Sequence, residues 1–346
     1  MSTRPAIEPK RSSRLGLSLP IFLVLAALAA WTGWWFVVAG RVEGETDKAA
    51  ADLRKAGYQV TWSDRRIDGW PFRTTVRLRD FSVIAPSGHA LTAPRLDAQA
   101  NTYALGQWMA VAPDGVVITR AEKGRVRITG QAIRASIAGL DRTPPRIVVE
   151  LRKPVFAPLP GADPFPLASA ELIDLYVRPN AQTRNAGDLL FRVKGGIPRP
   201  DGMLEWIGGG APFDLLVEGT ATSTDRFRGA GWAPAARAWS RAGGRITAVH
   251  GEASTGPTRA STSGQQLWVS PDGRLQGGLE LTLTGGPRSL MALARSGTID
   301  ALGARAAAAG MTLGGGLDGT VTVRLDFTPD GARLGPVRLS PAPRVF

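Results

Sequence analysis

Residues 15–40 form a run of 26 positions without a charged side chain. An α-helix rises about 1.5 Å per residue, so about 20 residues cross a hydrocarbon core of roughly 30 Å. The run therefore predicts one transmembrane helix. Four basic residues and one acidic residue precede it, and three acidic residues follow within 41–47. The positive-inside rule then predicts a cytoplasmic segment 1–14 and export of everything after residue 40, as a single-pass inner-membrane protein with most of its chain in the periplasm.

A cleaved signal peptide is the alternative interpretation of this run. Ala27-Leu28-Ala29 fits the small-x-small cleavage rule. The hydrophobic region of a signal peptide usually has 7–15 residues, whereas this run continues through Trp34, Trp35 and Phe36. Tryptophans at the outer end of a span are typical of the aromatic belt at the headgroups. We therefore expect a retained anchor.

The chain after the anchor changes from helical to strand-like patterning. Residues 41–57 predict a stalk helix, with acidic residues early, basic residues late, and Gly57 at its end. Apolar and polar residues then alternate, which is typical of half-buried strands. We expect the apolar positions of these strands to form a candidate ligand face, made of Val76, Leu78, Val126, Ile128, Val321, Val323 and Leu325.

Glycine and proline are frequent, with 42 and 26 copies. Five Pro-Asp-Gly or Pro-Ser-Gly turns begin at Pro86, Pro113, Pro200, Pro271 and Pro329. Proline presets φ and glycine accepts a positive φ, so each copy predicts a hairpin loop. The expected fold is mainly β: an exported domain over 58–346 built as a large curved antiparallel sheet, or meander. Short helices are expected at 233–242 and at 288–309, the latter broken at Gly297. A subdivision near residue 226 stays open.

The sequence contains few residues of the types that commonly carry catalysis. The chain has no cysteine and only two histidines, His89 and His250, so we expect neither a metal site nor a nucleophilic triad. Residues 314–319 spell G-x-G-x-x-G, but they follow a predicted helix, the reverse of the dinucleotide-binding order. No cofactor and no enzymatic activity are expected. The net charge of +13 attracts anions, but export argues against nucleic acid as the partner.

One short motif and several later segments resemble a bacterial family. Gly69-Trp70-Pro71-Phe72-Arg73 is similar to the Gly-aromatic-Pro-Phe-Arg segment of the DUF2125 family, a domain of unknown function. Residues 239–246, 272–281 and 334–339 resemble the second half of that family. The resemblance implies a location and an architecture but no reaction. Short strands that end in Asp-Gly also resemble, more distantly, the AsmA-like proteins, which implies envelope biogenesis and lipid handling.

Two functions therefore remain as expectations. The first is a non-catalytic module that binds or transfers lipid, or another amphipathic anionic ligand, along an apolar sheet face. Its expected headgroup contacts are Arg73, Arg77, Arg79, Arg125 and Arg127. The second is a structural or interaction protein of the cell envelope, with envelope proteins as partners, a closed core and no small ligand.

Overall fold

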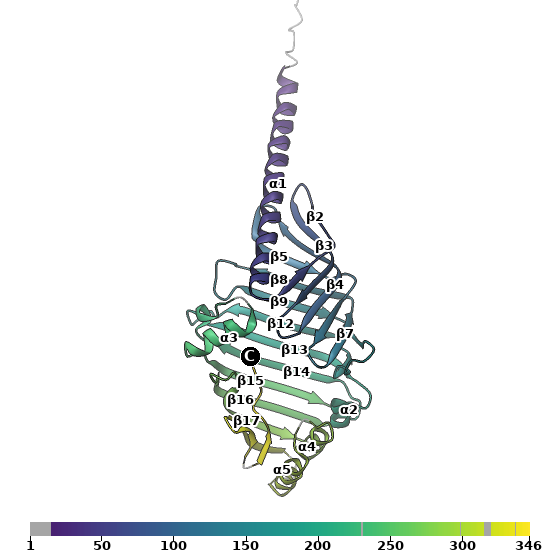
Figure 1. Ribbon diagram of the computed structural model, residues 1–346, viewed down its shortest axis with the longest axis vertical. Coiled ribbons are helices and arrows are strands. Elements are labelled where there is room, and N and C mark those ends of the chain that lie inside the picture. Colours follow the sequence, from purple (N-terminus) through teal and green to yellow (C-terminus); the bar gives the residue numbers. More distant parts are fainter. Residues whose placement is uncertain (1–14, 230, 298, 315–319, 336) are drawn as a thin grey trace, which may run out of the picture.

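The computed structural model describes residues 15–229, 231–297, 299–314, 320–335 and 337–346 (Figure 1). The fold is mainly β with one long N-terminal helix, as predicted. The helices are α1 (Leu15–Lys55), α2 (Met203–Gly208), α3 (Trp232–Arg241), α4 (Gly286–Arg295), α5 (Ala301–Gly314) and the 3-10 helix η1 (Thr224–Arg226). The strands of the first half are β1 (Gln59–Thr61), β2 (Asp64–Asp68), β3 (Arg73–Ile84), β4 (Ala90–Asn101), β5 (Ala104–Val111), β6 (Val116–Arg120), β7 (Gly124–Thr129), β8 (Ala132–Ala138), β9 (Arg146–Arg152), β10 (Val155–Pro158) and β11 (Leu167–Ser169). The remaining strands are β12 (Leu172–Pro179), β13 (Gly187–Pro198), β14 (Phe213–Ala221), β15 (Ile246–Thr255), β16 (Thr258–Val269), β17 (Leu275–Thr284), β18 (Thr320–Thr328), β19 (Gly331–Leu334) and β20 (Val337–Ser340).

The predicted anchor and the predicted stalk are one continuous helix, α1. No break occurs at Gly40, and the part from Leu19 onward is long and apolar enough to cross a membrane. The helix ends where the sequence predicts: Gly57 has a φ of 86°. The amides of Gly57 and Tyr58 donate to the carbonyls of Arg54 and Leu53. This pair of bonds is a Schellman motif, which satisfies the last carbonyls of a helix.

The strands nearest α1 form a closed circuit. The strand β4 is shared, because its first half pairs with β6 and its second half pairs with β5. One path runs from β5 through β8, β9 and β12 to β13. The other runs from β6 through β7, β10 and β11 to the same β13. Figure 1 shows β3, β4 and β7 lying in front of the strands from β8 to β13. We call β3, β4, β6, β7, β10 and β11 the front layer.

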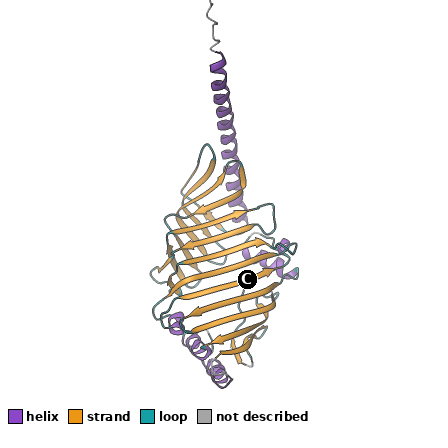
Figure 2. Cartoon of the chain, turned by 180° about the vertical axis from the view of Figure 1, so that it is seen from behind, coloured by secondary structure: helices purple, strands orange, loops and turns teal. Residues whose placement is uncertain are grey.

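Beyond β13 the sheet continues as a single antiparallel meander through β14 to β20, with each strand paired to the next. The ladder is unbroken near residue 226, because β14 pairs with both β13 and β15. The helices α4 and α5 pack on the far end around Leu283, Leu290 and Met311. Figure 2 shows the other side of these long strands, which the front layer does not cover.

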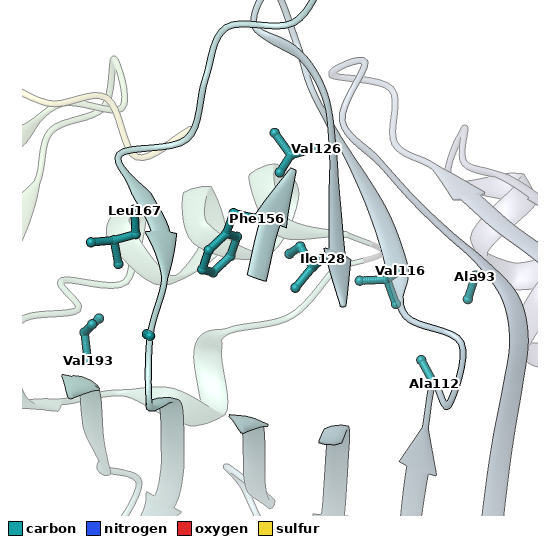
Figure 3. Close-up of a cluster of buried hydrophobic side chains, with 9 residues drawn as sticks. Ala93, Ala112, Val116, Val126, Ile128, Phe156, Leu167 and Val193 are labelled. Carbon is teal, nitrogen blue, oxygen red and sulfur yellow. The ribbon is translucent and has the colours of Figure 1, made fainter. Parts of the chain in front are cut away.

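The largest core cluster lies inside the closed circuit. Val126 and Ile128 of β7, Val116 of β6 and Phe156 of β10 face Val193 of β13 (Figure 3). Val126 is completely buried. The ring of Phe156 also stacks on Phe165, with 4.4 Å between the centroids. On β7 the buried Val126 and Ile128 alternate with exposed residues, which is the pattern that the sequence predicted for this strand.

Three of the five predicted hairpins are confirmed, and two are wrong. The turns at Pro86, Pro271 and Pro329 join paired strands. The turn at Pro113 joins β5 to β6, which pair with β8 and β7 instead, because this turn passes between the two layers. The turn at Pro200 leads into α2, a helix that the sequence analysis did not predict.

Candidate functional site

One face of the long sheet is largely apolar across nine strands, because most of the residues in register on neighbouring strands are apolar; Thr262 is the polar exception. We call two of these lines of aligned residues the covered row and the open row. The covered row is Ile133, Leu151, Ile173, Val193, Leu215, Ala253, Ala260, Leu283 and Val321. The open row is Ala135, Val149, Leu175, Phe191, Val217, Gly251, Thr262, Leu281 and Val323.

The two rows differ in what packs on them. At one end, the covered row lies under the front layer, with Val193 and Leu215 in the core of the closed circuit. At the other end, Leu283 and Val321 lie under α4 and α5. In the middle of the open row, Phe191 and Val217 remain 37% and 40% exposed. These two directly paired side chains form an uncovered apolar patch between two packed clusters.

The seven apolar residues predicted as a ligand face belong to three separate clusters. Val76 and Leu78 pack against Val38 and Val42 of α1 and are buried. Val126 and Ile128 lie inside the closed circuit. Val321, Val323 and Leu325 are half-buried near α4 and α5. Only Val321 and Val323 belong to the two rows described above.

The five predicted headgroup arginines are all exposed. On β3, Arg77 and Arg79 alternate with the buried Val76 and Leu78, so they project from the opposite face of that strand. Arg77 pairs with Asp68 at 2.9 Å, and Arg79 lies 4.0 Å from Asp64.

On β7, Arg125 and Arg127 likewise project away from the core of the closed circuit. Neither makes an ion pair with any residue that the structure describes. Arg73 is exposed and makes no ion pair with a described residue either, so Arg73, Arg125 and Arg127 are the three of the five that are most open to an anionic group.

The reverse face of the sheet is polar. Arg134, Glu150, Asp174 and Arg192 lie side by side on four consecutive strands. The Nη2 atom of Arg134 lies 2.8 Å from Glu150 Oε1, and that of Arg192 lies 2.6 Å from Asp174 Oδ2. Hydrogen bonds from Arg134 and then Arg152 hold the pKa of Glu150 below its ordinary value. A row of paired charges of this kind keeps the polar face compatible with water and sets the strand register.

Hollows open on this polar face as well. One hollow, of about 1440 Å³, has Ser263, Glu280 and Arg324 in its lining. These three residues are register neighbours on β16, β17 and β18. The lining mixes charges of both signs with glycine backbone and with apolar side chains such as Trp268 and Phe327. Chemically, this surface offers polar and charged groups to a ligand.

The predicted family motif forms the turn between β2 and β3 and contacts α1. The indole of Trp31 donates to the carbonyl of Pro71 at 2.8 Å, and that of Trp35 donates to the carbonyl of Arg73 at 2.9 Å. Gly69 has a φ of 107°, and a Cβ there would lie 2.8 Å from the carbonyl oxygen of Arg73. The glycine is therefore needed for the turn to close. The motif joins the sheet to the helix.

Each of the two histidines has a single side-chain hydrogen-bond partner among the described residues. His89 Nδ1 lies 3.1 Å from Ser87 Oγ, and His250 Nε2 lies 3.2 Å from Glu252 Oε1. Among the described residues, no group of three or more histidines, cysteines or carboxylates could hold a metal ion. Residues 315–319 of the G-x-G-x-x-G sequence lie outside the described residues.

The sequence analysis missed the most exposed residues of the open row, Phe191 and Val217. A signal was present, because Leu189, Phe191 and Val193 alternate with polar Asp188 and Arg192 except at Leu190. Alternation alone cannot tell which part of an apolar face other elements will cover.

Comparisons with known proteins agree with the resemblance of the Gly-Trp-Pro-Phe-Arg motif and the later segments. No curated protein and no solved structure matches the chain. The model of one family, described as "Uncharacterized protein conserved in bacteria (DUF2125)", matches residues 35–343. Because that match spans the stalk and almost all of the sheet, the chain belongs to the DUF2125 family.

Proposed function

We propose that this protein is a non-catalytic, membrane-anchored envelope protein that binds an amphipathic lipid along the apolar face of its meander. The acyl chains would lie on the open row around Phe191 and Val217. The chain would be held in the inner membrane by α1, with its N-terminus in the cytoplasm and its sheet in the periplasm.

The observation that carries the proposal is the uncovered pair Phe191 and Val217. Each lies in the middle of a largely apolar row that runs across nine strands, and packed clusters cover the two ends of the neighbouring covered row. Water contact with apolar surface costs roughly 25 cal/mol per Å². Contiguous apolar surface left open on a folded protein commonly marks an interaction site. An acyl chain is an extended apolar group that fits a row of aligned side chains.

The charges around the span support the proposed orientation. Basic residues dominate segment 1–14, and the first residues after the apolar run are mainly acidic. Exposed Arg125 and Arg127 on the outer side of the front layer would offer cationic groups to an anionic headgroup. The AsmA-like resemblance points to the same class of ligand.

A structural protein with a closed core is the second candidate, and one observation favours it. In the core of the closed circuit Val126 has no exposed surface, and Phe156 and Phe165 stack on each other. If the open row were covered by a partner protein in the envelope, no lipid would be required. The two functions differ in what occupies Phe191 and Val217.

Lipid co-purification separates them. The full chain is purified in mild detergent, and bound phospholipid per protein is measured by mass spectrometry after solvent extraction. Phe191→Asp should lower the bound lipid while the sheet stays folded by circular dichroism, with only a modest fall in melting temperature, because the side chain is already partly in water. Leu140→Asp, at an exposed leucine in the β8–β9 loop, is the matched control. Lipid that remains around α1 contributes equally to all three samples, so equal lipid in all three would refute the proposal.

A further inference from the structure

Three exposed aromatic side chains gather at two adjacent turns. Trp70 and Phe72 lie in the β2–β3 turn and are 48% and 64% exposed, and Tyr103 in the β4–β5 turn is 70% exposed. The amide of Thr102 donates to the carbonyl of Phe72 at 2.9 Å, which joins the two turns. We call Trp70, Phe72 and Tyr103 the aromatic foot.

The foot is fixed to α1 at one level of the helix. In addition to the bonds from Trp31 and Trp35 to the motif backbone, the indole of Trp70 donates to Thr32 Oγ1 at 3.2 Å. The rings of Phe72 and Trp31 lie 6.2 Å apart between centroids. Figure 1 shows the β2–β3 turn extending alongside α1, above the rest of the sheet. The height of the foot is therefore set by residues 31–35.

Helix geometry places that level at the edge of the hydrocarbon core. Counting from Leu15, about 20 residues at about 1.5 Å each span roughly 30 Å, which ends near Trp34. Trp34 is itself exposed, and so are the apolar side chains from Leu19 to Leu25 that precede it. Tryptophan and tyrosine favour the headgroup region, where an apolar ring and a polar tip are both satisfied.

We infer that the aromatic foot inserts into the outer headgroup layer of the bilayer that α1 spans. The sheet would then stand on the membrane through two attachments, the helix and the turns. Arg73 follows Phe72, is exposed, and would meet lipid phosphates at that depth. The inference rests on the proposed anchoring of α1 but not on the proposed lipid-binding role of the open row.

Exposure alone does not distinguish a bilayer from a partner protein, but the position of the foot does. A partner bound to Trp70 and Phe72 would have to occupy the layer that headgroups already fill around α1. The carbonyls of Pro71 and Arg73 accept hydrogen bonds from α1 and that of Phe72 accepts one from Thr102, so these three carbonyls need no partner protein. A lipid surface therefore suits the foot best.

The chain has no cysteine, so single cysteines can be introduced without other changes. The test uses the full chain in phosphatidylcholine–phosphatidylglycerol vesicles, with bimane attached to Phe72→Cys, Tyr103→Cys, Leu25→Cys or Leu302→Cys. Leu25 reports the span, and exposed Leu302 on α5 reports the distal end of the sheet. Quenching by doxyl lipids is compared with quenching by aqueous iodide, and circular dichroism checks that each variant folds as the wild type does.

The expected result is strong doxyl quenching at positions 25, 72 and 103, with iodide quenching only at position 302. Lipid quenching at 25 together with iodide quenching at 72 and 103 would overturn the foot while leaving the anchor intact. Iodide quenching at position 25 would overturn the anchor and the foot together. Protection of position 72 from both quenchers, replaced by iodide quenching when vesicles hold one copy each, would assign the foot to a second copy of the chain and would also overturn the inference.

Discussion

A valine-to-alanine change should lower the free energy of unfolding more in the closed core, at Val126, than on the open row, at Val217. Val126 has no exposed surface, whereas Val217 is 40% exposed. The change removes two methyl groups, worth about 0.8 kcal/mol each when fully buried. At Val126 the surrounding side chains, including Phe156 and Val193, cannot collapse easily, so a cavity cost is added. We expect Val126→Ala to lower the free energy of unfolding by about 2–3 kcal/mol.

At Val217 the same change should cost much less. Only about three fifths of the transfer energy is available, and no enclosed cavity forms, so the expected loss is about 1 kcal/mol. Urea titration of the full chain in detergent, followed by circular dichroism, measures both values. The denaturant slope should be unchanged in both variants. Equal losses at the two positions would show that Val217 is enclosed and would refute the distinction between the covered and open rows.

Other consequences of the structure can be measured independently. Leu78→Asp should abolish folding rather than ligand binding, seen as loss of the protein from membranes, because the side chain is buried against α1; normal abundance would contradict this. Glu150→Gln should weaken the fall in unfolding free energy at acid pH. A carboxyl whose pKa is lowered in the fold stabilises the fold at pH values above its ordinary pKa of 4.5, and this contribution is lost as the pH falls through its lowered pKa. The same acid dependence in the variant and the wild type would contradict this. Replacing His89 and His250 by Gln should leave abundance and any cellular phenotype unchanged. A periplasm-dependent reporter fused after Phe346 should be active, and a cytoplasm-only reporter there should be silent.

Local features of the fold could be predicted from the sequence, because they depend on neighbouring residues. The uncharged run predicts the apolar part of α1, and Gly57 predicts its end. The alternation in β3, β7 and β18 predicts which residues point inward. Pro-Asp-Gly turns predict tight reversals of the chain. The turn at Pro113 shows the limit of this signal, because a turn is set by neighbouring residues, whereas the strand that the next strand pairs with is set by distant ones.

Features that depend on pairing between distant strands could not be predicted from the sequence. The closed circuit depends on β4 dividing its two halves between β5 and β6, and no short motif encodes that choice. The burial of Leu78 by α1 had a weak signal, because Val38 and Val42 continue an apolar stripe at helical spacing toward the stalk. In the sequence, Phe191 has the alternation of an ordinary inward-facing residue. It is exposed because the front layer does not extend over this part of β13.

Photocrosslinking at neighbouring residues of β14 tests the proposed lipid site most directly. Val217 lies on the open row, and Leu216, in register with Arg192, points to the polar face. Benzoylphenylalanine is placed at either position in the full chain, cells are irradiated, and adducts are identified by mass spectrometry. A lipid-binding open row predicts phospholipid adducts at position 217 and none at position 216. Protein adducts alone at 217, or equal lipid labelling at both positions, would contradict it.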